Sequence, residues 1–190
     1  MGFFQTFPSE WEWVALIVGT LGFLMAVQPF IQMIWGRPKI QIQTGKGELN
    51  GTPYLEFVII NEPIRKGPTA WLRLHRETAS EIFASITLEE DNTGRVIAKE
   101  LLPELARRGT GQPGAQRVSL PASLFGVTAL VAFRSREANS IVIGGPKGAT
   151  QVLSPGQYKA TISVMGEGKA KRLSQKFMVN ADGTLYWLSN

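Results

Sequence analysis

The hydrophobic pattern divides the chain into one long apolar segment near the start and a larger region of short alternating runs. Residues 13–35 read WVALIVGTLGFLMAVQPFIQMIW and contain no charged side chain. A helix of roughly 23 residues is about 34 Å long, which is enough to cross a hydrocarbon core of about 30 Å. Trp13 and Trp35 lie at its ends, where indole rings favour the membrane interface. The pattern predicts a transmembrane helix over residues 13–35, after a short tail at residues 1–12.

A cleaved signal peptide is the competing interpretation of the same segment. Such a peptide needs a positively charged start, a shorter apolar stretch and a small-residue cleavage site. Residues 1–12 contain no Lys or Arg but do contain Glu10 and Glu12, and no A-x-A pattern closes the run. These features favour an anchor that is not cleaved.

Four small residues recur at helical spacing inside the apolar segment. They are Ala15, Gly19, Gly22 and Ala26. Residues three and four positions apart share one face of a helix, and small side chains there let a second helix approach closely. We therefore expect a helix–helix contact on this face, either by self-association or with another membrane protein subunit.

The remaining region, residues 37–190, alternates in short runs typical of β-strands. Eight or nine strands are predicted, at residues 39–43, 54–60, 82–88, 95–98, 127–133, 141–143, 158–164, 173–179 and 185–188. Turn signals such as Asp91–Gly94 and Asp182–Gly183 separate them. A short helix is expected over residues 98–108, limited by Pro103. This pattern predicts an all-β fold, a single sandwich domain attached to one transmembrane helix.

Residues 153–164, LSPGQYKATISV, place a Pro-Gly turn and Tyr158 before an alternating strand. This arrangement resembles the late strands of immunoglobulin-like and fibronectin-type β-sandwiches, which often have a tyrosine at such a corner. The resemblance covers about a dozen residues, and the Cys pair and core Trp of true immunoglobulin domains are missing. It implies a sandwich with a binding or spacing role.

Charge adds an orientation to this picture. All 20 Lys and Arg residues follow the apolar segment, and the whole chain has a formal charge of +5. The positive-inside rule therefore puts the N-terminus outside and the sandwich in the cytoplasm. Immunoglobulin-like modules are most often extracellular, which argues for the opposite orientation. We expect a single-pass protein of the cell membrane, with the cytoplasmic orientation favoured.

Candidate chemistry is sparse. The chain has no Cys and only one His, His75, which nearly excludes zinc sites and thiol nucleophiles. The G-x-G-x-x-G of residues 109–114 neither follows a strand nor opens a helix, so it is interpreted as a loop. Lys and Arg do not cluster with aromatic residues as in nucleic-acid-binding proteins. We expect no cofactor, no metal and no nucleic-acid partner.

Three arginines near the glycine-rich loop form the one candidate binding cluster. They are Arg107, Arg108 and Arg117. Guanidinium groups bind phosphate oxygens well, so the cluster is a candidate contact for an anion or a lipid headgroup. An exposed basic loop with no ligand is the plainer alternative.

Three functional hypotheses follow from these patterns. The first is that the chain is not an enzyme but an interaction or accessory module, a small subunit of a membrane complex with the bilayer and membrane proteins as partners. The second is an externally displayed adhesion-like or ligand-binding domain. The third is a membrane-tethered hydrolase that uses carboxylates such as Glu77, Glu81 or Asp91.

Overall fold

The computed structural model describes residues 10–49, 51–64, 75–107, 114–135, 140–143, 151–166 and 169–189. Within these ranges the chain forms one helix and twelve strands. They belong to two compact units. One unit holds helix α1 with the described residues Ile64 and His75, and the other holds every strand, within residues Pro38–Pro63 and Arg76–Asn190.

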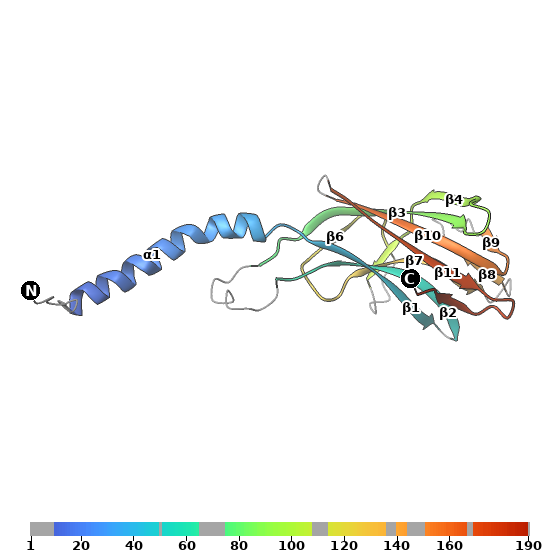
Figure 1. Ribbon diagram of the computed structural model, residues 1–190, viewed down its shortest axis with the longest axis horizontal. Coiled ribbons are helices and arrows are strands. Elements are labelled where there is room, and N and C mark those ends of the chain that lie inside the picture. Colours follow the sequence, from blue (N-terminus) through green and yellow to red (C-terminus); the bar gives the residue numbers. More distant parts are fainter. Residues whose placement is uncertain are drawn as a thin grey trace, which may run out of the picture. The chain divides into compact units, whose positions relative to one another are not determined.

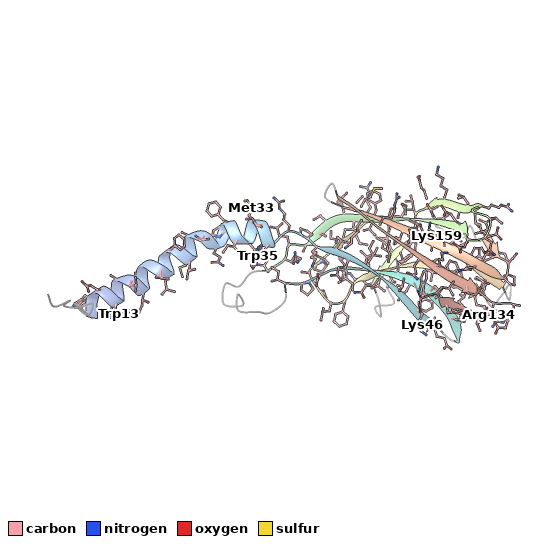
Figure 2. The ribbon with its side chains drawn as sticks, in the orientation of Figure 1. Trp13, Met33, Trp35, Lys46, Arg134 and Lys159 are labelled. Atoms are coloured by element: carbon pink, nitrogen blue, oxygen red, sulfur yellow. The ribbon has the colours of Figure 1, made fainter. Side chains whose placement is uncertain are left out.

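Helix α1 (Glu10–Trp35) contains the whole predicted segment and ends at the predicted residue. Figure 2 shows Trp13 and Trp35 near its two ends. Every side chain from Trp11 to Trp35 is exposed or half-buried, although most are apolar. The helix is long and apolar enough to cross a membrane, a criterion that membrane anchors and signal sequences both meet.

A hydrogen-bonded pair holds the end of α1. The Nε2 of Gln32 donates to the His75 carbonyl at 2.5 Å, and its Oε1 accepts from the His75 amide at 3.2 Å. The Gly36 amide donates to the Gln32 carbonyl at 2.6 Å, and a Cβ on Gly36 would overlap that same carbonyl. Glycine is therefore needed where the helix ends. His75 is an exposed residue outside any strand, as its sequence context indicated.

The strands form two six-stranded antiparallel sheets (Figure 1), which confirms the all-β sandwich prediction. The first sheet has the order β1-β2-β7-β8-β9, with β5 beside β7. Its strands are β1 (Ile40–Leu49), β2 (Thr52–Asn61), β5 (Leu105–Arg107), β7 (Val127–Ser135), β8 (Ser140–Ile143) and β9 (Gln151–Leu153). The second has the order β12-β11-β10-β3-β4, with β6 beside β3. Its strands are β3 (Ala79–Glu90), β4 (Val96–Leu101), β6 (Val118–Leu120), β10 (Gly156–Gly166), β11 (Lys169–Val179) and β12 (Leu185–Trp187).

The prediction of a short helix over residues 98–108 is wrong. Strand β4 occupies the start of that range and pairs with β3, and β5 occupies its end and pairs with β7. Ala98 and Leu105 are both buried in the core between the sheets. Tertiary burial of these two residues outweighs the helix propensity of the intervening sequence, and Pro103 separates the two strands.

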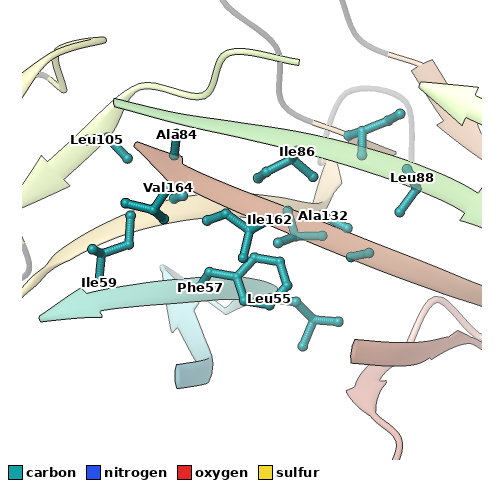
Figure 3. Close-up of a cluster of buried hydrophobic side chains, with 14 of the residues drawn as sticks. Leu55, Phe57, Ile59, Ala84, Ile86, Leu88, Leu105, Ala132, Ile162 and Val164 are labelled. Atoms are coloured by element: carbon teal, nitrogen blue, oxygen red, sulfur yellow. The ribbon is translucent and has the colours of Figure 1, made fainter. Parts of the chain in front are cut away.

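Alternating positions of the long strands fill the core, as Figure 3 shows for Phe57 and Ile162. Phe57 in β2 and Phe177 in β11 are fully buried. Trp187 packs on both, with ring centroids 5.1 Å from Phe57 and 5.7 Å from Phe177. The Trp187 indole N–H donates to the carbonyl of Gly45 at 2.7 Å, so β12 joins the second sheet to β1 of the first.

Strand register defines two ends of the sandwich. The end at which the chain enters β1 is called the proximal end. There β1 begins at Ile40 opposite Asn61, and β7 begins at Val127 opposite Ile59. Strand β3 also begins there, because Ala79 pairs with Leu120 and the Asn61 side chain donates to the Leu120 carbonyl. The opposite, distal end holds the β1–β2, β3–β4 and β11–β12 turns.

The Asn61 side chain connects three segments at the proximal end. Asn61 is fully buried, and its Nδ2 donates to the carbonyls of Glu77 and Leu120 at 2.8 and 3.1 Å. Its Oδ1 accepts from the Lys39 amide at 3.0 Å. One side chain thus fixes the chain before β1, the approach to β3 and the end of β6.

The Tyr158 side chain bonds back to the segment that precedes β10. Its hydroxyl donates to the Ser154 carbonyl at 2.7 Å, and its ring stacks on Phe177 with centroids 5.5 Å apart. Burial of the ring and the nearby Glu90 carboxylate raise the pKa of Tyr158, against a smaller lowering effect of the hydrogen bond to Ser154.

We predict that Asn61→Asp destabilises the sandwich. The carboxylate has no N–H to donate and would face two carbonyl oxygens, so we expect the free energy of unfolding to fall by about 2–4 kcal/mol at pH 7. Urea unfolding of the full chain in detergent, followed by tryptophan fluorescence, measures the change. Asn92→Asp makes the same chemical change in the exposed β3–β4 turn and should cost under about 0.5 kcal/mol. Equal losses in the two variants would contradict the role given to Asn61.

We predict a pH signature for Tyr158. Because the fold raises its pKa, the stabilisation is fully present below the unfolded value of about 10 and is lost as pH rises through the folded value. Tyr158→Phe should cost about 1 kcal/mol at pH 7, from loss of the bond to Ser154. The difference in thermal midpoint between wild type and variant should shrink above about pH 10. A difference that is constant from pH 7 to 11 would disprove the prediction.

Candidate functional site

The four small residues of the predicted contact face lie together on α1. Successive helical positions are about 100° apart, so Ala15, Gly19, Gly22 and Ala26 fall within an arc of about 60°. All four are exposed, and a Cβ added to Gly19 or Gly22 would have no atom within 4 Å. The face is open to a second helix. The helix–helix contact itself stays a prediction.

The fold brings two of the three predicted arginines to the proximal end. Arg107 ends β5 opposite Val127, where β7 begins. Arg117 precedes β6, and its guanidinium is 2.9 Å from the Glu81 carboxylate and 5.8 Å from the centre of the Phe83 ring. Arg108 lies outside the described residues. Anion or headgroup binding by this cluster stays a prediction.

Two lysines also lie at the same end. The Lys39 ammonium nitrogen lies 2.7 Å from an oxygen of the Glu62 carboxylate, and this ion pair is partly exposed to solvent. The ammonium group of Lys171, at the start of β11, donates to the Ile40 carbonyl at 2.8 Å. Because that acceptor is neutral, the bond positions Lys171 without balancing its charge.

Sequence analysis missed a second feature of the proximal end, the loop of residues 121–126 between β6 and β7. Leu124 is 78% exposed and Phe125 is 84% exposed, and these are the highest values among the large apolar side chains of the described sandwich. The sequence does contain a signal for this feature. Pro121 and Gly126 indicate a turn, whose residues are expected to be polar, yet two consecutive apolar residues lie between them.

The carboxylates of the hydrolase hypothesis do not form one group. Glu81 lies near the start of β3 and pairs with Arg117, whereas Asp91 follows the end of β3 and pairs with Lys176 at 2.8 Å. Ten residues of extended strand separate them by about 33 Å. Among the described residues, no cluster of three or more His, Asp and Glu side chains is placed to hold a metal ion.

Glu81 has an unusual backbone. Its φ of 53° is in the left-handed region, at an irregularity in the pairing between β3 and β6. This conformation costs an ordinary residue about 1–2 kcal/mol. The bulge places the Glu81 carboxylate within reach of Arg117, so the arginine is held on the proximal surface by a local distortion of β3.

No protein-family model and no curated protein matches the chain. Among solved structures, it is similar to a family 123 glycoside hydrolase from Clostridium perfringens, described in terms of glycolipid glycan hydrolysis. The two are 12% identical with a TM-score of 0.37, and the match covers 75% of this chain. It covers 27% of the hydrolase, so the chain spans about a quarter of the length of that protein.

The comparison corrects one expectation. Sequence analysis favoured a module that is not an enzyme because it found no catalytic motif, yet a solved structure that the chain is similar to is an enzyme, so that expectation is withdrawn. The physical reason is that a hydrolase can use carboxylates from distant parts of a chain, which leave no short motif. At this TM-score the likeness carries no argument for a particular activity.

Proposed function

We propose that the chain is a single-pass membrane protein in which α1 anchors a β-sandwich that serves as an interaction module, as a small subunit of a membrane complex. The observation that carries this proposal is the solvent exposure of α1. Its apolar side chains from Trp11 to Trp35 lie outside any core, whereas the sandwich fills its core with its own residues. A helix that is apolar on all faces and buries none of them needs an apolar solvent.

Two structural features support an immunoglobulin-like, fibronectin-type sandwich. The first is the partition of strands, with β2 beside β7 in one sheet and β3 beside β10 and β11 in the other. This matches strands B and E opposite strands C, F and G of immunoglobulin folds. The second is Tyr158, whose hydroxyl bonds back to the carbonyl four residues upstream. Modules of this class commonly bind other proteins.

The sequence supports a cytoplasmic sandwich, because all Lys and Arg residues follow the helix. The immunoglobulin-like strand arrangement favours the second candidate function, an externally displayed adhesion-like or ligand-binding domain, because such modules are most often extracellular. The two candidates differ in topology, which a single labelling experiment distinguishes.

We predict that Gly19→Leu with Gly22→Leu separates the protein from its helix partner. Both glycines face open space, so leucines leave the isolated helix intact but block close approach of another helix. Helix packing of this kind is worth about 1–2 kcal/mol, so the crosslinked fraction in native membranes should fall about tenfold. Crosslinking followed by gentle detergent extraction and native electrophoresis measures it.

Thr20→Leu is the matched control for the glycine variant. It makes a similar small-to-large change about 130° around the helix from the small-residue face. The Thr20 hydroxyl donates to the Leu16 carbonyl of its own helix, at 2.7 Å. The control should keep the wild-type assembly. A wild-type protein that is already monomeric under gentle extraction would refute the subunit proposal.

We predict that a cysteine in place of Asn92 is shielded in intact cells. Asn92 lies in the exposed β3–β4 turn, and the chain has no other cysteine. An impermeant maleimide should label the variant only after permeabilisation, whereas Thr6→Cys in the N-terminal tail should be labelled at once. The reverse pattern would exclude the cytoplasmic orientation and support the externally displayed domain.

A further inference from the structure

The loop of residues 121–126 holds Leu124 and Phe125 outward by contacts on both sides. The Ser123 amide donates to the Asn61 carbonyl at 3.1 Å, and the Ser123 hydroxyl accepts from the Phe125 amide at 3.0 Å. Gly126 lies so close to β2 that an added Cβ would overlap the Ile59 carbonyl. The two apolar side chains therefore project from a fixed loop rather than a loosely attached one.

Basic side chains lie near this loop at the proximal end, and Arg117 among them is paired with Glu81. Arg107 lies opposite Val127, the residue that follows the loop, and Arg117 lies on the other side of β6 from it. Lys171 bonds to the carbonyl of Ile40, the first residue of β1. Exposed apolar residues flanked by Lys and Arg are typical of surfaces that bind the interface of an anionic bilayer.

The covalent link limits the distance between the end of α1 and the beginning of β1. Only four peptide units separate Trp35 from Lys39, and four units span at most about 15 Å. Trp35 is a residue of the membrane interface if α1 crosses the bilayer. The beginning of β1 then stays within reach of the headgroup layer, which is about 5–8 Å thick on each side.

We propose that the proximal end of the sandwich rests on the bilayer that α1 spans, with Leu124 and Phe125 in the interface and Arg107, Arg117 and Lys171 beside anionic headgroups. This inference rests on the anchoring role proposed for α1. It makes the loop a second membrane contact, so that the module is held against the surface instead of turning freely on its tether.

A bilayer fits this surface better than a second copy of the chain. A stable protein interface buries about 1,200–2,000 Å² in total. Leu124 and Phe125 together offer roughly 400 Å² at most, and the residues around them are charged. Two exposed apolar side chains with basic residues nearby are sufficient for a contact with the membrane interface, because α1 supplies most of the free energy of membrane binding.

Spin labels on the full chain in nanodiscs test the proposal. The absence of cysteine allows a single label at Leu124→Cys, at Leu21→Cys in the middle of α1, or at Val96→Cys on β4. Accessibility to a water-soluble nickel complex and to oxygen is measured by electron paramagnetic resonance. In nanodiscs with anionic phosphatidylglycerol, we expect nickel accessibility at position 124 to fall at least about fivefold below that at position 96.

The label in α1 separates the two proposals. A lipid-buried label at position 21 with a fully aqueous label at position 124 would overturn the loop contact and leave the anchor intact. An aqueous label at position 21 would overturn the anchor and the loop contact together. Spin–spin broadening at position 124 would show that a second copy covers the loop, which would also overturn the lipid contact.

Two further variants test which groups make the contact. Adding Phe125→Ser to the Leu124→Cys chain should restore most of the nickel accessibility, and thermal unfolding should be unchanged because Phe125 is 84% exposed. Arg117→Gln should restore part of it in anionic nanodiscs, whereas Lys99→Gln on β4 should have no effect. Equal protection in anionic and in purely zwitterionic nanodiscs would overturn the role given to the basic residues.

Discussion

The buried amide of Asn61 is the interaction on which the proximal end of the sandwich depends. Three backbone segments that are distant in sequence meet at this one side chain, through Lys39, Glu77 and Leu120. An unsatisfied backbone group at such a depth would cost about as much as a lost hydrogen bond. The amide satisfies three of them at once, and in doing so it sets where β1, β3 and β6 begin or end. The position of the 121–126 loop follows, because its Ser123 amide bonds to the carbonyl of the same residue.

The elements that the sequence predicted are those whose composition or periodicity can be recognised within a single segment of the chain. The apolar run ending at Trp35 specifies a helix by composition alone, and long strands such as β10 alternate over enough residues to be recognised. Strands β5, β6 and β9 are three residues long, too short for any period to show. Residues 98–108 were misassigned for a related reason, since Ala98 and Leu105 become core residues only through pairing with β3 and β7.

The candidate site was predictable only in part. The face of Ala15, Gly19, Gly22 and Ala26 follows from helical spacing, so sequence and structure agree on its geometry. Arg107 and Arg117 were grouped because they flank one loop, but their common location at the proximal end depends on β5 pairing with β7 and β6 with β3. Leu124 and Phe125 were not predicted as a surface feature, because two adjacent apolar residues are usually buried in a core. Only the structure shows that both side chains are exposed.

Because of Trp187, the core of the sandwich can be completed only after the end of the described chain has been synthesised. Its ring packs on Phe57 and Phe177, and its indole N–H bonds to the Gly45 carbonyl in β1. A ribosome makes β12 after all the other described strands, so the core that β2 and β11 share stays uncovered until translation has passed residue 187. The side of Phe57 and Phe177 that Trp187 covers is therefore the last part of the described core to be completed.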